Sequence, residues 1–194
     1  MPPKKPAAGE KKPPKEITAT DKAVEFIMAY DLPALEKLLE EQRVAQAKSI
    51  NKLDQKWGKT ALFCAAEEGR MDMLMLLIDY KAKVNSWTRD RRTPIMGAAH
   101  MAEDGIIEFL VAEHSADVTI ASNDGETAMH IAARRGHLST CQLLHAKGCA
   151  VDTVSVALET PLGSALKMMH FKVSEGHVNF SMPVKGRIYR NGKS

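Results

Sequence analysis

Side chains that could carry chemistry gather between Gly125 and His137, in the stretch GETAMHIAARRGH. An imidazole such as that of His130 can act as a general base, and a nearby glutamate or arginine can orient a substrate. A covalent mechanism also needs an activated nucleophile, and none recurs beside this histidine. We therefore expect His130 to bond the backbone of a neighbouring turn and to have no catalytic role.

The sequence contains no motif of another common enzyme or metal site. It has no G-x-G-x-x-G, P-loop, G-x-S-x-G, H-E-x-x-H or paired-carboxylate pattern. Cys64, Cys141 and Cys149 form no C-x-x-C pair, which is typical of buried, reduced thiols. We therefore expect no catalytic residue, no bound cofactor and no metal ion.

The composition is that of an ordinary globular chain. Of its 194 residues, 44% are hydrophobic and 26% are charged. No apolar run is long enough to span a membrane, and the amino terminus lacks the apolar segment of a secretory signal. We expect a cytoplasmic location, with nuclear or cytoskeletal association left open. The formal net charge of +3 arises at the two ends, which are rich in lysine and arginine.

A period of 33 or 34 residues organises the chain between these ends. The stretches TALFCAA, TPIMGAA and TAMHIAA begin at Thr60, Thr93 and Thr127, and TPLGSA begins at Thr160. Each of the first three copies continues into a second apolar run, which predicts a pair of short helices. One such pair is too thin to bury its own apolar face, so neighbouring pairs must stack. The repeat therefore predicts an all-α solenoid.

Three local expectations follow from the repeat frame. Each threonine hydroxyl should accept a backbone N–H at the start of its helix, a cap worth about 1 kcal/mol. The copy that begins at Thr93 has one extra residue, which we expect near Glu103, in the turn between its two helices. Arg91 replaces the glycine found at Gly58 and Gly125, and we expect a stiffened or distorted hairpin there because glycine tolerates a positive φ.

These residues resemble the ankyrin repeat, which joins a Gly-x-Thr-Pro-Leu-His opening, an Ala-Ala helix, a Gly-His turn, a Leu-Leu helix and a closing Val-Asn. GETAMHIAARRGHLSTCQLL follows this pattern nearly throughout, and Val84-Asn85 supplies a closing pair. Phe63 and Met96 depart from it where His130 agrees. The resemblance implies an ankyrin-repeat solenoid of stacked antiparallel helix pairs with projecting hairpin loops.

The resemblance also implies a domain organisation. We expect a disordered Lys/Pro-rich tail over 1–18, a capping helix pair over 19–53, repeats over 54–87, 88–121 and 122–155, a partial repeat over 156–170, and a basic tail over 171–194. Asp31 should cap the second helix of the first pair, which begins near Pro33 and could continue to residue 48. The partial repeat leaves an apolar surface uncovered around Leu162, Leu166 and Met169.

Ankyrin repeats generally bind other proteins through hairpin tips and a concave groove, so the resemblance implies a non-catalytic adaptor. By position, the hairpin tips offer Lys56, Trp57, Lys59, Trp87, Arg89, Asp90, Arg92, Asn123, Asp124 and Glu126. The groove offers Glu67, Glu68, His100, Met101, Arg134 and Arg135. Tryptophan and arginine are the commonest interface anchors, so the tryptophans, Arg89 and Arg92 are the strongest candidates. The alternative is that Trp57 packs on the next hairpin and the arginines form a solvated rim.

A second function stays open from the sequence alone. The incomplete last repeat could dock onto a cytoskeletal or other assembly, which would make the chain a structural subunit. The basic tails could add electrostatic contact with an acidic surface. No interleaved aromatic residues, RNP-like strand or zinc spacing predicts sequence-specific binding of nucleic acid. The expected partner is therefore a protein, and the chain is a monomer or an assembly subunit.

Overall fold

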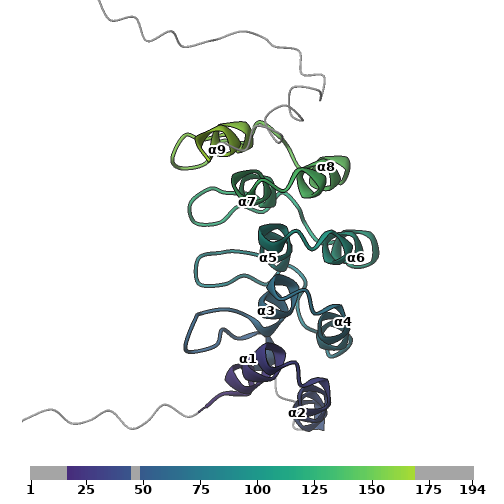
Figure 1. Ribbon diagram of the computed structural model, residues 1–194. Coiled ribbons are helices and arrows are strands. Elements are labelled where there is room, and N and C mark those ends of the chain that lie inside the picture. Colours follow the sequence, from purple (N-terminus) through teal and green to yellow (C-terminus); the bar gives the residue numbers. More distant parts are fainter. Residues whose placement is uncertain (1–16, 45–48, 169–194) are drawn as a thin grey trace, which may run out of the picture.

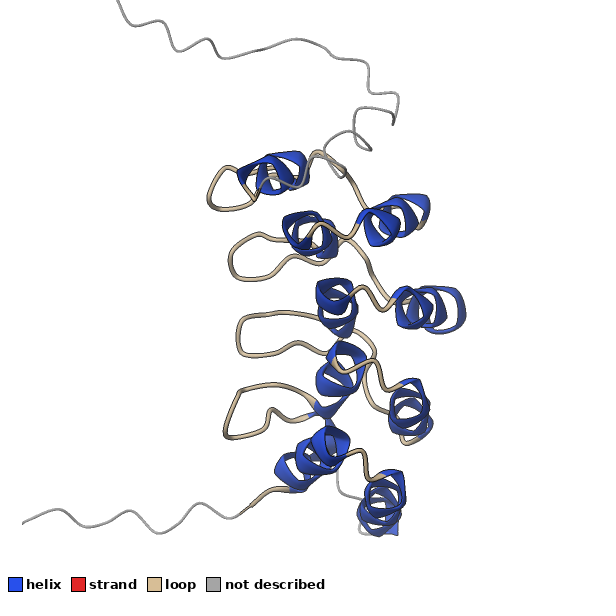
Figure 2. Cartoon of the chain, in the orientation of Figure 1, coloured by secondary structure: helices blue, strands red, loops and turns tan. Residues whose placement is uncertain are grey.

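The computed structural model describes residues 17–44 and 49–168, which form two parallel rows of short helices (Figure 1). The inner row holds α1 (Ala19–Ala29), α3 (Ala61–Glu67), α5 (Pro94–Met101), α7 (Ala128–Arg135) and α9 (Pro161–Lys167). The outer row holds α2 (Leu32–Val44), α4 (Met71–Asp79), α6 (Asp104–His114) and α8 (Leu138–Ala146), and a short 3-10 helix, η1, spans Ser49–Asn51. These two described ranges contain no strand (Figure 2). The predicted all-α solenoid is confirmed.

A loop projects from the stack before each of the last four inner helices (Figure 1). We call these loops fingers 1 to 4 (residues 54–59, 88–92, 122–126 and 155–159), and we number layers 1 to 4 after them. Each predicted interval from 19–53 to 122–155 contains one helix pair, and 156–170 contains α9. The boundaries themselves remain predictions. Residues 1–16 and 171–194 of the two predicted tails lie outside the described residues. The predicted extension of the second helix over 45–48 and Met169 also lie outside them.

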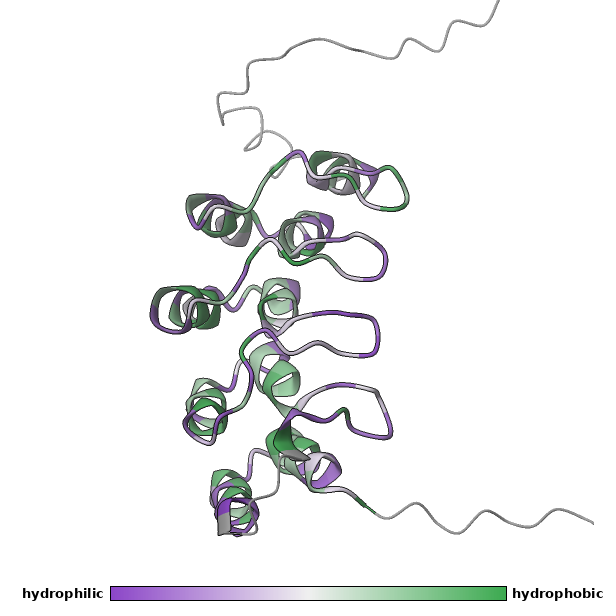
Figure 3. Cartoon of the chain, turned by 180° about the vertical axis from the view of Figure 1, so that it is seen from behind, coloured by the Kyte–Doolittle hydropathy of each residue, from purple (hydrophilic) through white to green (hydrophobic). Residues whose placement is uncertain are grey.

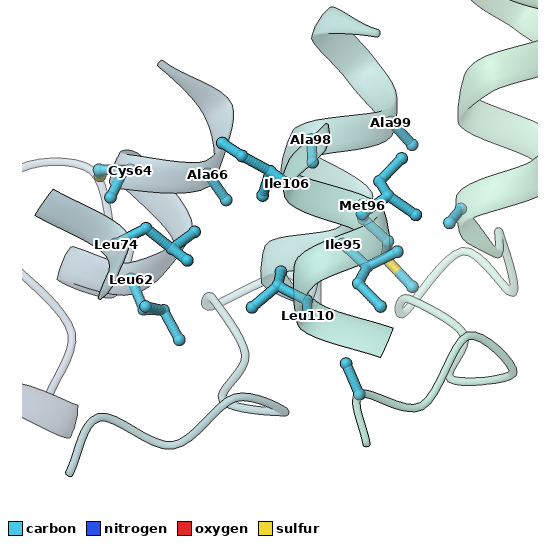
Figure 4. Close-up of a cluster of buried hydrophobic side chains, with 14 of the residues drawn as sticks. Leu62, Cys64, Ala66, Leu74, Ile95, Met96, Ala98, Ala99, Ile106 and Leu110 are labelled. Atoms are coloured by element: carbon cyan, nitrogen blue, oxygen red, sulfur yellow. The ribbon is translucent and has the colours of Figure 1, made fainter. Parts of the chain in front are cut away.

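Small side chains allow the inner helices to stack closely. The paired alanines of α3, α5 and α7 are all fully buried: Ala65, Ala66, Ala98, Ala99, Ala132 and Ala133. As a result α3 packs on α5, α5 on α7 and α7 on α9. Leu74 of α4 and Leu110 of α6 belong to the same continuous core (Figure 4). Each layer thus buries the apolar face that its neighbour cannot bury alone.

One contact between layers 1 and 2 depends on the absence of a side chain. Gly97 of α5 lies against Phe63 of α3, which is itself buried. A Cβ added to Gly97 would lie 3.3 Å from both the Phe63 ring and the Phe63 carbonyl oxygen. It would also lie 3.4 Å from the Cβ of Glu67. The large residue in one layer is therefore matched by glycine in the next.

The predicted threonine caps form at two of the four positions. The hydroxyls of Thr60 and Thr160 accept the backbone N–H three residues ahead, at 3.2 and 3.1 Å. Thr93 makes no such side-chain bond, so the expectation is wrong there. Its backbone is still extended, and Pro94 starts the helix with a ring that already fixes a helical φ. At Thr127 the hydroxyl oxygen lies 3.0 Å from Nδ1 of His130.

The extra residue of layer 2 lies at the end of α6, and its predicted place near Glu103 is wrong. Helix α6 has 11 residues, whereas α4 and α8 have nine each. Leu77 and Leu110 both stand 17 residues after their capping threonines, Thr60 and Thr93. The apolar register is therefore unchanged up to Leu110, and the additional residue lengthens the exposed end of the helix.

Finger 2 keeps the shape of the other fingers, so the distortion expected from Arg91 is wrong. The φ of Arg91 is 59°, close to the values of 67° at Gly58 and 71° at Gly125. Leu158 adopts the same left-handed conformation in finger 4, with a φ of 59°. A left-handed non-glycine residue costs about 1 to 2 kcal/mol. In finger 2 the closing bond from the Arg91 N–H to the Thr88 carbonyl oxygen, 2.9 Å long, helps to offset that cost.

The first helix pair, α1 and α2, lies at the start of the described stack. Asp31 precedes α2 and accepts the Ala34 N–H at 3.0 Å, while Pro33 occupies the first turn of that helix. Asp21 of α1 accepts the backbone N–H of Gln55 at 2.6 Å. Burial raises the pKa of Asp21, but hydrogen bonds from Gln55 and from Thr18 at the start of α1 together lower it by more, so the net shift is downward. A charged carboxylate thus ties the capping pair to finger 1.

Candidate functional site

The fingers form one connected surface. Backbone hydrogen bonds join each tip to the preceding one, from N–H to carbonyl oxygen: Arg89 to Gly58 at 2.8 Å, Asn123 to Asp90 at 3.0 Å and Val156 to Asp124 at 2.8 Å. A surface that is already ordered loses less conformational entropy when a partner binds. The fingers are therefore pre-organised for binding.

A buried carboxylate shapes finger 1. Asp54 accepts the backbone N–H groups of Lys56, Trp57 and Lys59, at 3.0, 2.8 and 2.6 Å. The turn that results leaves Trp57 44% exposed. The Lys56 ammonium lies 4.1 Å from the centroid of this indole, within the range of a cation–π contact. Trp57 is thus held in place from one side and open to solvent on another.

A second tryptophan, Trp87, lies just before finger 2 and is 53% exposed. The Arg91 guanidinium lies 5.3 Å from its ring centroid. Trp87 lines a shallow cavity of about 450 Å³ together with Leu53 and Asn85. An aromatic side chain beside an open apolar recess is a common anchor for a partner side chain.

The groove face combines the last residue of each finger with residues near the end of the inner helix that follows it. In every layer the last finger residue is paired with the helix residue eight positions later in the sequence: Lys59 with Glu67, Arg92 with His100, Glu126 with Arg134, and Glu159 with Lys167. The first, third and fourth pairs are salt bridges. Layer 2 instead brings an arginine and a histidine together, and in the described part of the chain neither forms an ion pair.

The imidazole of His100, in layer 2, lies near three guanidinium groups. Its Nε2 contacts the Nη2 of Arg135. Burial lowers the pKa of His100, and the positive charges of Arg135, Arg92 and Arg134 lower it further. Glu67 raises this pKa, but the net shift is downward. His100 is therefore neutral at pH 7.

His130 is fully buried and bridges two layers. The Thr127 N–H donates to its Nδ1 at 3.2 Å, so the proton of the neutral ring lies on Nε2, which donates to the Glu159 carbonyl oxygen at 3.0 Å. Burial lowers the pKa of His130 and keeps the ring neutral. The prediction that this histidine bonds a neighbouring turn is confirmed.

We expect the free energy of unfolding to fall as the pH drops below about 6.5, the ordinary pKa of histidine. His130 and His100 both have lowered pKa values in the folded chain, so the unfolded chain binds more protons in this range. Stability must then rise with pH and is lost as the pH falls toward the folded pKa values. Urea titrations of the wild type and of His130→Phe check this. The variant should show a smaller loss, and equal losses would contradict the role of His130.

The predicted site residues divide into two groups by exposure. Nine are exposed on the fingers and the groove: Lys56, Trp57, Trp87, Arg89, Asp90, Met101, Asn123, Asp124 and Arg135. Five are half-buried members of the paired positions: Lys59, Arg92, His100, Glu126 and Arg134. Sequence reasoning missed Asp54, and it missed the layer 4 pair Glu159 and Lys167. The spacing of eight residues was a usable signal for that pair.

Other reactive groups of the described chain are held in unreactive states. Burial raises the pKa of both Cys64 and Cys141 to about 12 and also raises that of Cys149, so all three thiols are protonated. Across residues 17–44 and 49–168, no group of three or more histidine, cysteine or acidic residues is arranged to hold a metal ion. No helix in these ranges has the length and apolar character needed to cross a membrane.

Comparison with known proteins gives consistent matches. A family model described as "Ankyrin repeats (3 copies)" matches residues 23–122 and again residues 101–175. Human "Ankyrin repeat and KH domain-containing protein 1" is 35% identical over 106 residues, which are 53% of this chain and 4% of that protein. "Ankyrin repeat domain-containing protein 63" is 30% identical in human and 29% identical in mouse over 115 residues, 58% of this chain. Those residues are 30% and 29% of the two relatives.

The chain thus spans less than a third of the length of each of these relatives. Ankyrin repeats are generally protein–protein interaction modules, and the family is generally non-catalytic. The family model covers more than half of the chain and the same residues that build the stacked helix pairs. The chain therefore belongs to the ankyrin repeat family.

Proposed function

We propose that this chain is a non-catalytic adaptor that binds a protein partner through its fingers and groove. The observation that carries the proposal is the pair of half-exposed tryptophans Trp57, on finger 1, and Trp87, just before finger 2. Each has a cation near its ring, and a backbone bond from Arg89 to Gly58 joins fingers 1 and 2. A cytoplasmic location is part of the proposal, supported by the unpaired cysteine thiols.

The surroundings of the tryptophans support this proposal. Figure 3 shows mostly hydrophilic residues along the fingers, whereas hydrophobic residues concentrate in the helices. A protein interface commonly has a few aromatic anchors inside a polar rim. Lys56 and Arg91 lie near the two indoles, and the charged residues Arg89 and Asp90 are exposed on finger 2, so polar side chains are available for such a rim.

We expect Trp57→Ala and Trp87→Ala each to weaken partner binding by about 1 to 3 kcal/mol, because each removes a large, already ordered contact surface. Affinity capture from cell lysate, quantified by mass spectrometry, identifies the partner, and titration of that partner then gives the change in affinity. The melting temperature should remain unchanged, since both residues are half exposed.

Met75→Ala is the matched control. Met75 is 46% exposed, much like Trp57 at 44%, but it lies on α4 in the outer row, away from the fingers. Its replacement should leave capture unchanged. Equal affinity of the wild type and both tryptophan variants for every captured protein would overturn the assignment of the fingers as the binding surface.

A second candidate function is that of a structural subunit, supported by the last described helix. Helix α9 packs on α7, and within the described residues it has no outer helix of its own. Leu166 and Met168 are both about half exposed as a result, at 50% and 52%. Sedimentation at rising protein concentration separates the two functions: association lost on Leu166→Glu favours the subunit, and a monomer at all concentrations favours the adaptor.

A further inference from the structure

Layer 2 breaks the charge pattern of the groove. In the other three layers, the finger residue and the helix residue eight positions later have opposite charges and form a salt bridge. In layer 2 the finger residue is Arg92 and the helix residue is His100, which is neutral. The guanidinium of Arg92 therefore lacks the carboxylate that Lys59 and Lys167 find in their layers.

Two hydrogen-bond donors in this layer have no acceptor. The Nε of Arg92 and the Nδ1 of His100 are both buried without a partner. Arginine can only donate, so the contact between Arg135 Nη2 and His100 Nε2 makes Nε2 the acceptor and leaves the ring proton on Nδ1. A buried donor without an acceptor costs about 1 to 3 kcal/mol. An incoming group with acceptor oxygens would remove that cost.

The local charge balance is positive. Arg92, Arg134 and Arg135 all act electrostatically on His100. Among the described carboxylates nearby, Glu126 is bonded to Arg134, and Glu67 is bonded to the lysine of finger 1. Two guanidinium groups, those of Arg92 and Arg135, thus remain without a carboxylate.

An open space adjoins this positive centre. Arg92 lines a cavity of about 500 Å³ whose other lining residues come from layers 3 and 4 and include the salt-bridged pairs of both layers; His100 and Arg135 do not line it. Asp124 also lines it, yet no ion pair links Asp124 with Arg92 among the described residues. The lining of the cavity comes from fingers 2, 3 and 4 and from α7 and α9, so a segment bound in it would contact layers 2, 3 and 4.

We propose that layer 2 of the groove binds an aspartate or glutamate side chain of an acidic peptide segment in the partner, between Arg92, His100 and Arg135. This inference rests on the proposed adaptor function and names the chemistry that the groove recognises. The carboxylate supplies acceptors to Arg92 Nε and His100 Nδ1 and completes the one layer that has no internal ion pair. Its entry requires the Arg92 side chain to turn toward the cavity, a rotamer change of the kind common at interfaces.

The experiment uses the full chain and a fluorescent peptide of alternating glycine and glutamate as the probe. We expect Arg92→Gln and Arg135→Gln each to weaken the dissociation constant about tenfold, because each removes a charged hydrogen-bond donor. Arg43→Gln removes the same charge from α2 in the outer row, where Arg43 pairs with Glu40. It should change the dissociation constant by no more than about twofold. The basic ends of the chain are identical in all variants, so their contribution cancels.

A second readout locates the contact. On binding of the glutamate peptide, the imidazole Nδ1 resonance of His100 should shift, because its proton gains an acceptor, and the shift should be absent in Arg92→Gln. Equal affinities of Arg92→Gln and Arg43→Gln, an unmoved His100 resonance, or Arg92-dependent binding of a glycine–phosphoserine peptide in place of the glutamate peptide would each overturn the inference.

The result is separable from that of the tryptophan variants. Loss of capture by Trp57→Ala and Trp87→Ala, together with no binding of the glutamate peptide, would leave the adaptor function standing and overturn the acidic-peptide site. Arg92-dependent binding of the glutamate peptide, together with unchanged capture by the tryptophan variants, would support the site and remove the fingers from the interface.

Discussion

Replacement of His130 by alanine is expected to lower the free energy of unfolding by about 4 kcal/mol. The imidazole is fully buried, so its loss leaves a cavity between layers 3 and 4. It also leaves the Thr127 N–H and the Glu159 carbonyl oxygen without their bonds of 3.2 and 3.0 Å. Urea denaturation followed by far-UV circular dichroism measures the loss. Hydrogen exchange should show that α9 opens first, because its finger loses the tie to α7.

Two further variants serve as controls for His130→Ala. His130→Phe fills the same volume with the residue found at this position in layer 1, Phe63, and loses only the hydrogen bonds. Its loss should therefore be smaller than that of His130→Ala. Gln142→Ala changes an exposed residue of α8 and should have little effect. If His130→Ala unfolds at the same urea concentration as Gln142→Ala, the ring does not join the two layers.

The Gly97→Leu variant should lose about 3 kcal/mol of stability through overpacking between layers 1 and 2. The space that a Cβ would enter is already occupied by the Phe63 ring and backbone, at 3.3 Å. Helices α3 and α5 must separate to admit the new side chain, and the continuous apolar core on both sides resists that movement. Urea denaturation gives the change in free energy, and a double variant with Phe63→Ala should recover part of the loss.

Gly105→Ala is the matched control for this substitution. Gly105 lies on the exposed side of α6, and a Cβ there would have only the Met71 Cε near it, at 3.9 Å. Alanine is the better helix former by about 1 kcal/mol, so this variant should be as stable as the wild type or more stable. Equal effects of Gly97→Leu and Gly105→Ala would show that the two layers are not in close contact.

The fold could be predicted because its signal is repeated. The stretches that begin with threonine recur every 33 or 34 residues, so the alignment of any one copy can be tested against the other copies. Local departures could not be predicted so well. An extra residue between Thr93 and Val118 fits either a longer turn or a longer helix, and only the register of Leu110 decides between them. Arg91 takes a left-handed conformation because bonds to other residues fix its finger, and propensity alone cannot foresee such bonds.

The candidate site was predictable as a surface but not as a set of bonds. The repeat frame tells which residues follow a finger or an alanine pair, and those residues do lie on the fingers and the groove. The frame does not tell that Glu126 is bound to Arg134 while Arg92 has no carboxylate. Whether a charge is already neutralised within the chain depends on side-chain positions in three dimensions, and this decides which residues remain available to a partner.

A main-chain hydrogen bond joins each pair of neighbouring fingertips, donated by the N–H of Arg89, Asn123 and Val156, and the Asn123 side chain adds a bond from its Nδ2 to the Arg89 carbonyl oxygen at 3.3 Å. Main-chain groups are common to nearly all amino acids, so these three main-chain bonds can form with different side chains at the fingertips. Mutation can therefore change what the protruding loops recognise while the framework that carries them persists. This separation of support from recognition gives the protein room to acquire new binding preferences without first giving up its folded form.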